Sequence, residues 1–591
     1  MRRLALYIFL SLIAFSAKSQ YYLRGEVKDE KYARLQNVKI FVHSAKTLYY
    51  TGVDGSFGII LRTPKDTLTF SLEGYEELTT PVDHNQWQNI VMKVLIANAN
   101  KNKQKLISVT KDKKQDSRLN WVISDETYFA LVENDIVNAE RFPNTGFSLN
   151  VNKASYSNVR RFLNMGSLVP PDAVKAEELV NYFNLHYSEP AAGETFKVES
   201  QVTSCPWKAE DQLLYLNVSA KKLNLEKIPP SNFVFLIDVS GSMDMPNKLP
   251  LLQAAFQLFV KNLREKDRVS IVIYGGSVGV WLQPTPGSEK EKIIKSIEEL
   301  TAQGDTPGES AIRMAYKVAR STFIPEGNNR IILATDGDFN VGETTEKALD
   351  ELVSRERQSG VYLTCLGVGM GNLKDSKLQV LAKKGNGNYA YLDNVSEAEK
   401  TLVQELTQTL YAVADDAVLN IEFNPAMVKK YRLIGFDNKK EALANNSVEL
   451  EGGEVGSGNS TMAIFQITPT DLNLMTTTSS VSEDIAQITV RYSNSGDTLS
   501  RSIGCRVPHN YLHIDEANKA MKFAASVSLF AMKLKNSPFA TSDWQMVSDL
   551  ASASADKDNF LQSEYLKLIE TARKLYDDRK KKKKKKKGDE E

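Results

Sequence analysis

Side-chain oxygens gather in three loops of this 591-residue chain, in a pattern that suits a hard divalent cation. The first loop, Asp238-Val-Ser240-Gly-Ser242, follows the apolar run Phe233–Ile237, and later loops carry Asp305-Thr306 and Thr335-Asp336. Mg²⁺ prefers octahedral oxygen coordination and keeps several of its waters. We therefore predict a site for Mg²⁺ or Mn²⁺ built from five residues: Asp238, Ser240, Ser242, Thr306 and Asp336.

The chemistry of such a site favours docking over catalysis. Neutral hydroxyls bound directly to the metal, with carboxylates in or near the outer layer of ligands, leave the metal electron-poor. It can then take an acidic side chain of a partner as its last ligand. The opposing interpretation is a structural turn, because Asp and Ser often make local hydrogen bonds in turns. The Asp-x-Ser-x-Ser pattern alone is therefore weak, and its weight comes from the elements around it.

Those elements alternate between apolar strands and amphipathic helices from about residue 231 to residue 410. The pattern predicts a mostly parallel sheet that is covered by helices on both faces. Open sheets of this kind bind their ligands at the carboxyl ends of the strands. Asp238 and Asp336 end expected strands, and Thr306 lies in a loop that can reach the same edge. The expected strands are 233–239, 268–274, 330–335, 362–368 and 389–392.

The three loops resemble the metal-ion-dependent adhesion site (MIDAS) of von Willebrand factor type A (VWA) domains, which have a Rossmann-like α/β fold. This resemblance implies that the two serines and the threonine touch the metal, while the two aspartates act mainly through waters. One residue departs from the pattern: Asp305 stands where a small or hydroxyl residue is expected. An extra carboxylate there could tighten metal binding and weaken the preference for an acidic ligand.

A bacterial envelope subfamily of VWA proteins is similar in two further stretches, Ala334-Thr-Asp-Gly-Asp-Phe-Asn-Val-Gly342 and Lys384-Gly-Asn-Gly-Asn-Tyr-Ala-Tyr-Leu392. In that subfamily a companion segment precedes the VWA domain and a family-specific domain follows it. We expect a β-sandwich at the N-terminus, because short alternating strands are separated by turn signals such as Asp54-Gly55. The order of its short sequence motifs resembles that of the carboxypeptidase regulatory-like domain. That domain is usually an accessory fold, and we find no peptidase ligands in this segment.

The chain divides into seven predicted parts. The C-terminal domain is expected to be α+β, with helices at 516–534 and 559–576, and strands at 198–218 are expected to prepare the VWA domain. The parts are a signal peptide (1–19), the β-sandwich (20–96), a linker (97–120), the companion segment (121–230), the VWA domain (231–410), the C-terminal domain (411–577) and a polybasic tail (578–591).

The overall charge of the chain gives no support for a nucleic-acid-binding function. Lys and Arg number 74 against 73 Asp and Glu, so the net charge of +1 gives no general attraction to nucleic acid. The basic run 579–587 is expected to stay disordered and solvated, with weak contact to anionic lipid as the alternative.

The first residues read as a signal peptide: Arg2 and Arg3, a short apolar core, and a cleavage site near Ser19. The mature chain would then start near Gln20 outside the inner membrane, in the periplasm or cell envelope. Cys205 and Cys505 could pair there or remain separate thiols.

Enzymatic chemistry is not expected, because neither Ser240 nor Ser242 has an evident histidine partner and no phosphate-binding loop is present. Two hypotheses remain. In the first, the protein docks an acidic residue of a protein partner through the metal. In the second, it is an envelope scaffold in which the metal only rigidifies the loops.

Overall fold

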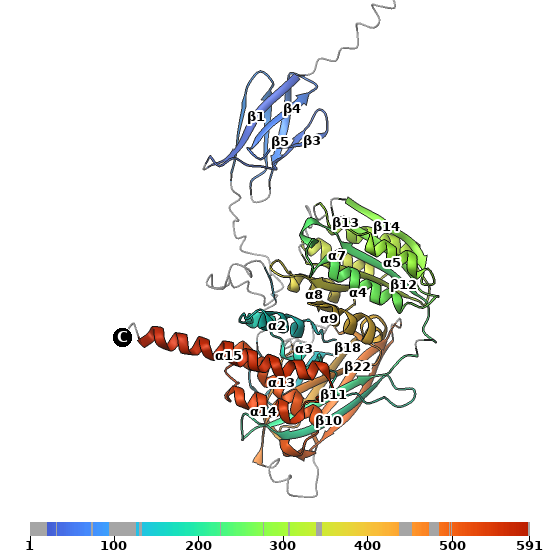
Figure 1. Cartoon of the computed structure of the whole chain (residues 1–591), viewed down its shortest axis with the longest axis vertical. Helices are drawn as coiled ribbons and strands as arrows, with labels where there is room; N and C mark the ends of the chain where they lie inside the picture. The colour runs from blue at the N-terminus through green and yellow to red at the C-terminus, as the bar shows by residue number, and fades with distance from the viewer. Residues whose placement is uncertain are drawn as a thin grey trace, which may run out of the picture. The chain divides into compact units, whose positions relative to one another are not determined.

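The computed structural model describes residues 21–93, 126–128, 133–304, 308–337, 346–436, 452–471 and 484–588, apart from positions 31, 73–74, 225, 276, 496 and 498. The chain forms two compact units, Met1–Ser108 and Val109–Glu591. The predicted signal peptide, the linker 97–120, and both Asp305 and Thr306 lie outside the described residues. The companion segment, the α/β domain and the C-terminal domain therefore share one unit (Figure 1).

The N-terminal unit is the strand-rich domain that the alternating pattern predicts. One sheet has the order β4-β1-β7, and the other has the order β3-β2-β5-β6. Side chains that alternate along the strands, such as Leu23, Val27, Ile40 and Phe70, form its core. The strands are β1 (Tyr21–Asp29), β2 (Lys39–Val42), β3 (Thr47–Tyr50), β4 (Ser56–Leu61), β5 (Lys65–Ser71), β6 (Leu78–Asp83) and β7 (Gln88–Met92).

The α/β domain is built on a sheet of order β14-β13-β12-β15-β16-β17, in which only β14 is antiparallel. This confirms the predicted Rossmann-like fold, although β14 was not expected from the sequence. The strands are β12 (Ser231–Asp238), β13 (Arg268–Gly275), β14 (Ser277–Pro286), β15 (Asn328–Thr335), β16 (Val361–Val368) and β17 (Tyr389–Leu392).

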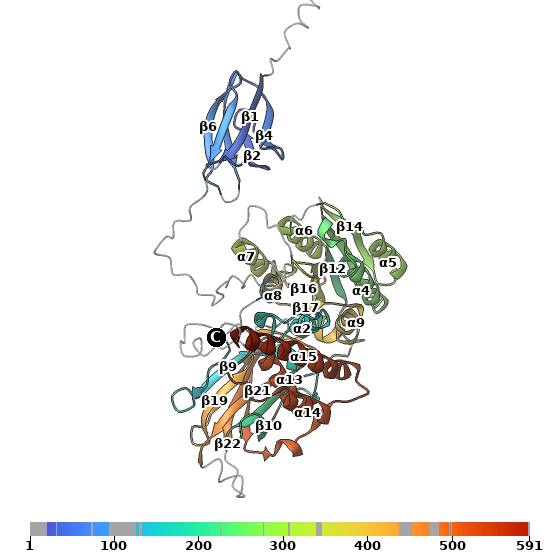
Figure 2. The same ribbon diagram turned by 60° about the vertical axis from the view of Figure 1, so that its left-hand side comes forward.

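Both faces of this sheet are covered, which explains why its strands are apolar throughout. On β12, Phe233, Phe235 and Ile237 pack in one core with helices α4 (Leu249–Lys261) and α5 (Lys290–Glu298). Val234 and Leu236 pack in the other core. The helices on that side are α6 (Gly308–Ser321), α7 (Glu346–Arg357) and α8 (Asp375–Lys384), and the domain ends with α9 (Val395–Glu399), a π-helical turn (Lys400–Gln404) and α10 (Leu406–Leu410). Figure 2 shows the two layers of helices, with α4 and α5 on one face of the sheet and α6, α7 and α8 on the other.

The companion segment and the C-terminal domain build a second sandwich together. One sheet has the order β24-β10-β11-β21-β19-β8; the other has β20-β18-β22-β23, with β9 also pairing with β18. The strands of the companion segment are β8 (Val137–Asn138), β9 (Asn144–Ser148), β10 (Phe196–Ser204) and β11 (Gln212–Ala220). Those of the C-terminal domain are β18 (Ala412–Phe423), β19 (Val428–Ile434), β20 (Gly453–Gly456), β21 (Ser460–Pro469), β22 (Asp484–Asn494), β23 (Ser500–Pro508) and β24 (Tyr511–Leu512).

The prediction that strands at 198–218 prepare the α/β domain is therefore wrong. Strand β11 pairs antiparallel with β21, which lies more than 240 residues further along the chain, as in the Leu216–Ala463 pair. Every residue of β11 is buried, so it needs a strand on each side and packing on both faces. The companion segment supplies β10 on one side of β11, and the C-terminal domain supplies β21 on the other. The α/β domain is therefore an insertion between two halves of one sandwich.

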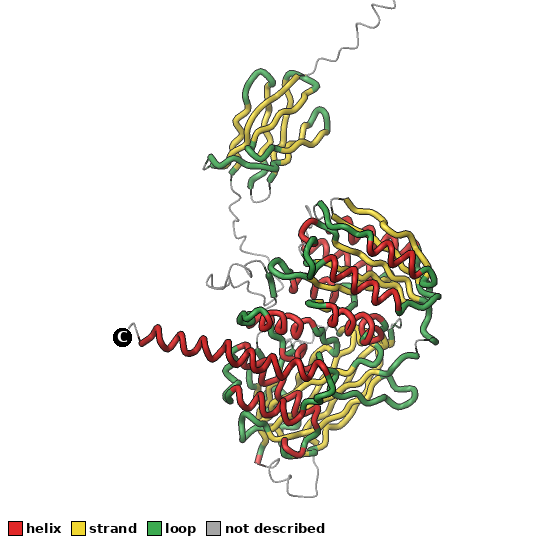
Figure 3. The backbone as a smooth tube through the Cα atoms, in the orientation of Figure 1, coloured by secondary structure: helices red, strands yellow, loops and turns green. Residues whose placement is uncertain are grey.

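Helices cover one sheet of this sandwich (Figure 3). They are α2 (Ala154–Asn164), α3 (Ala176–Asn181), α13 (Lys519–Lys535), α14 (Trp544–Ser554) and α15 (Phe560–Gly588). The basic run was expected to be disordered, but α15 continues through it to Gly588. Lysine is a good helix former, and extending an existing helix avoids the cost of nucleation.

Two further observations concern the cysteines and the helices. Cys205, Cys365 and Cys505 are all free thiols, so the considered Cys205–Cys505 pair does not form. Among the described residues, we find no helix with both the length and the apolar character that a membrane span requires.

Candidate metal centre

Asp238 ends the central strand β12, and its side chain is fully buried. Its Oδ1 accepts a hydrogen bond from the Ser240 amide at 2.9 Å, and its Oδ2 accepts one from the Thr335 hydroxyl at 2.9 Å. Burial raises the pKa of Asp238 to about 6, and the neighbouring charge of Asp336 adds to this rise against the hydrogen bonds from Ser240. Such a carboxylate is stabilised by a nearby cation.

The two serines connect this carboxylate to the next one. Ser240 Oγ lies 3.2 Å from Ser242 Oγ, and Ser242 Oγ donates to Asp336 Oδ2 at 2.8 Å. Ser240 is buried, whereas Ser242 is exposed. Asp336 directly follows β15 and is fully buried. The structure thus brings together Asp238, Ser240, Ser242 and Asp336 at the carboxyl edge of the sheet.

Thr306, the fifth predicted residue, lies outside the described residues, but the chain on its amino side reaches the site. The Gly241 amide donates to the Gly304 carbonyl at 3.0 Å, and the Gln303 amide donates to the Val239 carbonyl at 2.6 Å. These two backbone bonds tie the second loop to the first.

Sequence reasoning missed two residues at the site, Lys248 and Asn372. Lys248 Nζ lies 2.9 Å from Asp336 Oδ2 and 3.1 Å from Asn372 Oδ1. Asn372 Nδ2 donates to the same Asp336 oxygen at 2.9 Å. Lys248 is 3% exposed, so its ammonium is paired within the site and not in solvent. No local sequence pattern marks either residue. Lys248 directly precedes helix α4 and belongs to none of the three predicted loops, and Asn372 is far from Asp336 in the sequence.

Close backbone approach holds these groups in place. Gly369 has a φ of +79°, and a Cβ there would come within 2.5 Å of Lys248 Cε. Gly337 has a φ of +86°, and a Cβ there would come within 2.9 Å of the Lys374 amide nitrogen. Both positions therefore require glycine for conformation and for space.

The donor set fits a hard divalent cation. Two carboxylates are buried here, and the ammonium of Lys248 pairs with that of Asp336, while Asp238 accepts hydrogen bonds from the Ser240 amide and the Thr335 hydroxyl. The hydroxyls of Ser240 and Ser242 lie beside them. Within the described ranges no group of three or more His, Cys, Asp or Glu side chains could hold a metal. The hydroxyl oxygens of Ser240 and Ser242, together with waters, are suitable ligands for a cation such as Mg²⁺.

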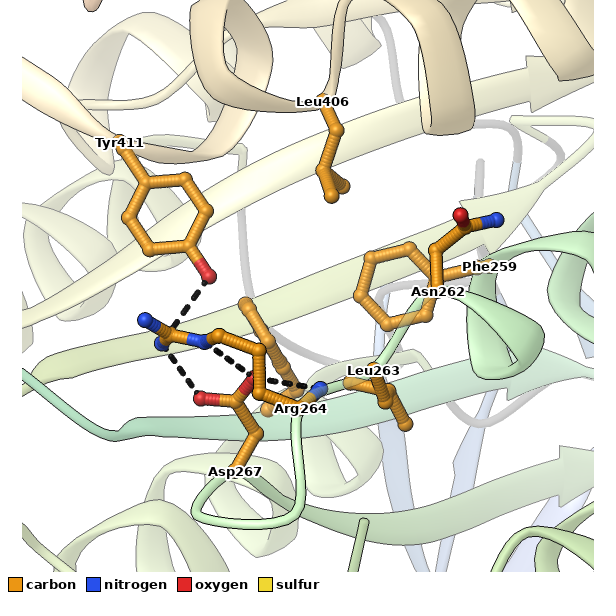
Figure 4. Close-up of a pocket in the computed structure, with 8 residues that line it drawn as sticks. Phe259, Asn262, Leu263, Arg264, Asp267, Leu406 and Tyr411 are labelled. Carbon is orange, nitrogen blue, oxygen red and sulfur yellow. Dashed lines mark hydrogen bonds and ion pairs between the residues drawn. The ribbon is translucent and has the colours of Figure 1, made fainter. Parts of the chain in front are cut away.

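A small cavity lies near the start of β12, at the other end of the strand from Asp238 (Figure 4). Its volume is about 70 Å³, which is room for a few waters but not for an organic ligand. Arg264 Nη2 lies 2.6 Å from Asp267 Oδ1 and 3.4 Å from the Tyr411 hydroxyl. The charge of Arg264 is already neutralised by Asp267. We therefore interpret the cavity as a small gap in the packing and not as a binding site.

Comparison with known proteins agrees with the fold. Residues 232–408 match the family model described as von Willebrand factor type A domain, and residues 122–215 match one described as von Willebrand factor. Residues 408–575 match the model described as the C-terminal part of uncharacterized protein YfbK. The fold and the site therefore define a VWA-domain protein, as the sequence motifs predicted.

The chain belongs to the YfbK family. It is 36% identical over 463 residues to uncharacterized protein YfbK of Escherichia coli (strain K12). The match covers 74% of this chain and 80% of that protein. It is also 30% identical over 183 residues to human inter-alpha-trypsin inhibitor heavy chain H3, but spans only 20% of that protein and 30% of its own length.

A solved structure described as von Willebrand factor type A from Catenulispora acidiphila is 14% identical to this chain. The match covers 64% of this chain and 89% of that one, with a TM-score of 0.38.

Proposed function

We propose that this protein is an extracytoplasmic, non-enzymatic binding protein that docks an acidic residue of a protein partner through a divalent cation. Ser240, Ser242 and Thr306 would hold Mg²⁺ or Mn²⁺, and Asp238 and Asp336 would orient its waters and balance its charge. The observation that carries the proposal is the convergence of two buried carboxylates and two hydroxyls at the carboxyl edge of the sheet. Membership of the VWA family is consistent with protein binding.

Exposure of one ligand supports docking in particular. Ser242 is exposed while Asp238 and Asp336 are fully buried, so a cation held between them would face solvent on one side. A partner's carboxylate could replace a water there without disturbing the buried groups.

The scaffold alternative gains less support from the structure. Protein groups already tie the loops together, through the Gly241–Gly304 backbone bond and the Lys248–Asp336 ion pair. A metal whose only role was to hold these loops would add little to such contacts.

The remaining parts fit an accessory and envelope role. We infer that the N-terminal sandwich is an accessory domain of the carboxypeptidase regulatory-like kind, and we retain the seven-part division of the chain. The predicted signal peptide favours a location in the periplasm or cell envelope. The polybasic end of the chain would at most add weak contact with anionic lipid.

Metal titration of the purified protein tests the proposal. Wild type should bind Mg²⁺ or Mn²⁺ in calorimetry, and Asp336→Ala should lose most of that affinity. Asp244→Ala is the matched control, because Asp244 is an exposed carboxylate in the same loop. Equal metal affinity in all three proteins would refute the site.

A second experiment separates docking from scaffolding. Immobilised wild type and Asp336→Ala would be incubated with envelope extract in Mg²⁺ or in EDTA, followed by elution with a short acidic peptide. A docking metal predicts that a protein is retained only by wild type with Mg²⁺ and is released by the peptide. Equal recovery in every arm would leave the metal a structural role.

A further inference from the structure

The loop that joins β16 to α8 contacts the metal centre with one side. This coupling loop, residues 369–374, places Asn372 on Asp336 and packs Gly369 against the stem of Lys248. Its Gly369 amide also donates to the Asn247 carbonyl at 3.2 Å. The position of the loop therefore decides where both neighbours of Asp336 lie.

The other side of the coupling loop is held by the companion segment. Residues 126–128 form a short strap along it. Glu126 Oε1 accepts a hydrogen bond from the Gly371 amide at 2.7 Å, and the Thr127 amide donates to the Leu373 carbonyl at 3.0 Å. Beyond the loop, the Ser376 amide donates to the Thr127 carbonyl at 3.3 Å.

Arg161 on helix α2 fixes both the strap and the loop. Its two terminal nitrogens contact the two oxygens of Glu126 at 2.7 and 2.9 Å. Burial alone would raise the pKa of Glu126, but the hydrogen bonds and charge of Arg161 outweigh it and keep that pKa below its ordinary value. Arg161 also lies over the Tyr391 ring at 5.2 Å, and the Tyr391 hydroxyl donates to the Gly369 carbonyl at 2.6 Å.

We propose that Glu126 and Arg161 are positioning residues of the metal centre, which act through the coupling loop. This inference rests on the proposed metal-dependent function and adds that the companion segment sets the affinity of the site. Two contiguous routes lead from Arg161 to the loop, one through Glu126 to Gly371 and one through Tyr391 to Gly369. The loop then carries the constraint to Asp336 through Asn372 and Lys248.

The coupling has to be reciprocal. If the strap favours the loop position that binds metal, bound metal must favour the docked strap by the same factor. This gives two independent measurements, one at the metal and one at the strap.

A matched pair of neighbouring arginines tests the first direction. Arg160 and Arg161 are adjacent on α2 and both buried, but Arg160 pairs with Asp393, Glu397 and Glu564 and not with the strap. Calorimetric titration with Mg²⁺ should show affinity reduced about fivefold or more in Arg161→Gln and in Glu126→Ala. Arg160→Gln should stay within about twofold of wild type, since its partners lie outside the coupling loop.

Hydrogen exchange of the wild-type protein tests the reverse direction and needs no variant. The Gly371 and Thr127 amides bridge the strap and the loop, so Mg²⁺ should slow their exchange. The inference fails if wild type binds Mg²⁺ while Arg161→Gln binds it equally well, or if Arg160→Gln and Arg161→Gln lose the same affinity. It also fails if Mg²⁺ leaves the exchange rates of both the Gly371 and the Thr127 amides unchanged. Absence of metal binding by wild type would overturn the proposed function together with it.

Discussion

The two ends of strand β12 differ in how they balance buried charge. At the amino end, the single carboxylate of Asp267 meets the guanidinium of Arg264, with Nε at 2.9 Å and Nη2 at 2.6 Å. At the carboxyl end, Asp336 pairs with the ammonium of Lys248, while the buried carboxylate of Asp238 accepts hydrogen bonds from neutral groups, the Ser240 amide and the Thr335 hydroxyl. The first end is neutral and closed, while the second keeps negative charge that a cation can satisfy. Charge balance, more than burial, therefore separates the candidate binding edge from the structural edge.

A third cluster shows the opposite ratio. Glu405 lies 3.1 Å from Lys153 and 2.9 Å from Lys400, so one carboxylate meets two ammonium groups. Such a cluster stabilises the ionised acid and has no need of an added cation. The three clusters differ in their balance of buried charges, and each difference predicts a measurable effect of substitution.

The largest expected effect comes from removing the carboxylate at the metal edge. Asp238→Ala should reduce Mg²⁺ affinity by at least about a hundredfold, because carboxylate charge dominates affinity for a hard cation. Calorimetric titration measures this loss. Asp267→Ala, at the opposite edge, is the control and should keep the wild-type metal affinity. If both variants lost metal binding, the loss would reflect a destabilised fold and would not be specific to the carboxyl edge.

Breaking the ion pair at the amino edge should have the converse outcome. Arg264→Leu leaves the nearly buried carboxylate of Asp267 without its partner and should lower the free energy of unfolding by about 2 kcal/mol. Urea unfolding measures this change, and metal affinity should not move. A stability equal to wild type would show that the pair contributes no net stabilisation.

Changing the cation at the metal edge should have a smaller effect of opposite sign. Lys248→Met removes the ammonium 2.9 Å from Asp336 and should raise Mg²⁺ affinity by about tenfold, since the metal no longer competes with it. Competition with a fluorescent chelator gives the affinity. A decrease would instead mean that the orientation of Asp336 by Lys248 outweighs this competition.

The smallest expected effect is a pH dependence at the third cluster. Burial would raise the pKa of Glu405, but the charges of Lys153 and Lys400 lower it to about 2. A depressed acid adds stability above its unfolded pKa, and this is lost as pH falls toward the folded pKa. Between pH 7 and pH 4 the loss should be about 1 kcal/mol in wild type. Urea midpoints at both pH values should show a shallower dependence for the triple variant Lys153→Met, Lys400→Met and Glu405→Gln, which removes the acid without leaving two buried ammonium groups unpaired. An identical dependence would contradict the lowered pKa of Glu405.

Prediction from the sequence succeeded where local pattern and local chemistry coincide. The strands that carry Asp238 and Asp336 are buried on both faces, so continuous apolar runs mark them, and the residues at their carboxyl ends could be placed at one edge in advance. It failed for β11, whose partner β21 lies far along the chain. It also failed for the basic run, which continues α15 because helix extension is cheaper than helix nucleation.

The sequence by itself thus determined the α/β alternation, the companion and C-terminal segments of the family, and four of the site residues that the structure brings together. Only the tertiary structure decided that Lys248 and Asn372 flank Asp336, that Glu126 and Arg161 hold the loop behind them, and that companion and C-terminal strands share sheets. The physical reason is separation along the chain. A strand followed by an oxygen-rich turn is written in consecutive residues, whereas a buried ion pair or a sheet neighbour depends on where the whole chain has packed.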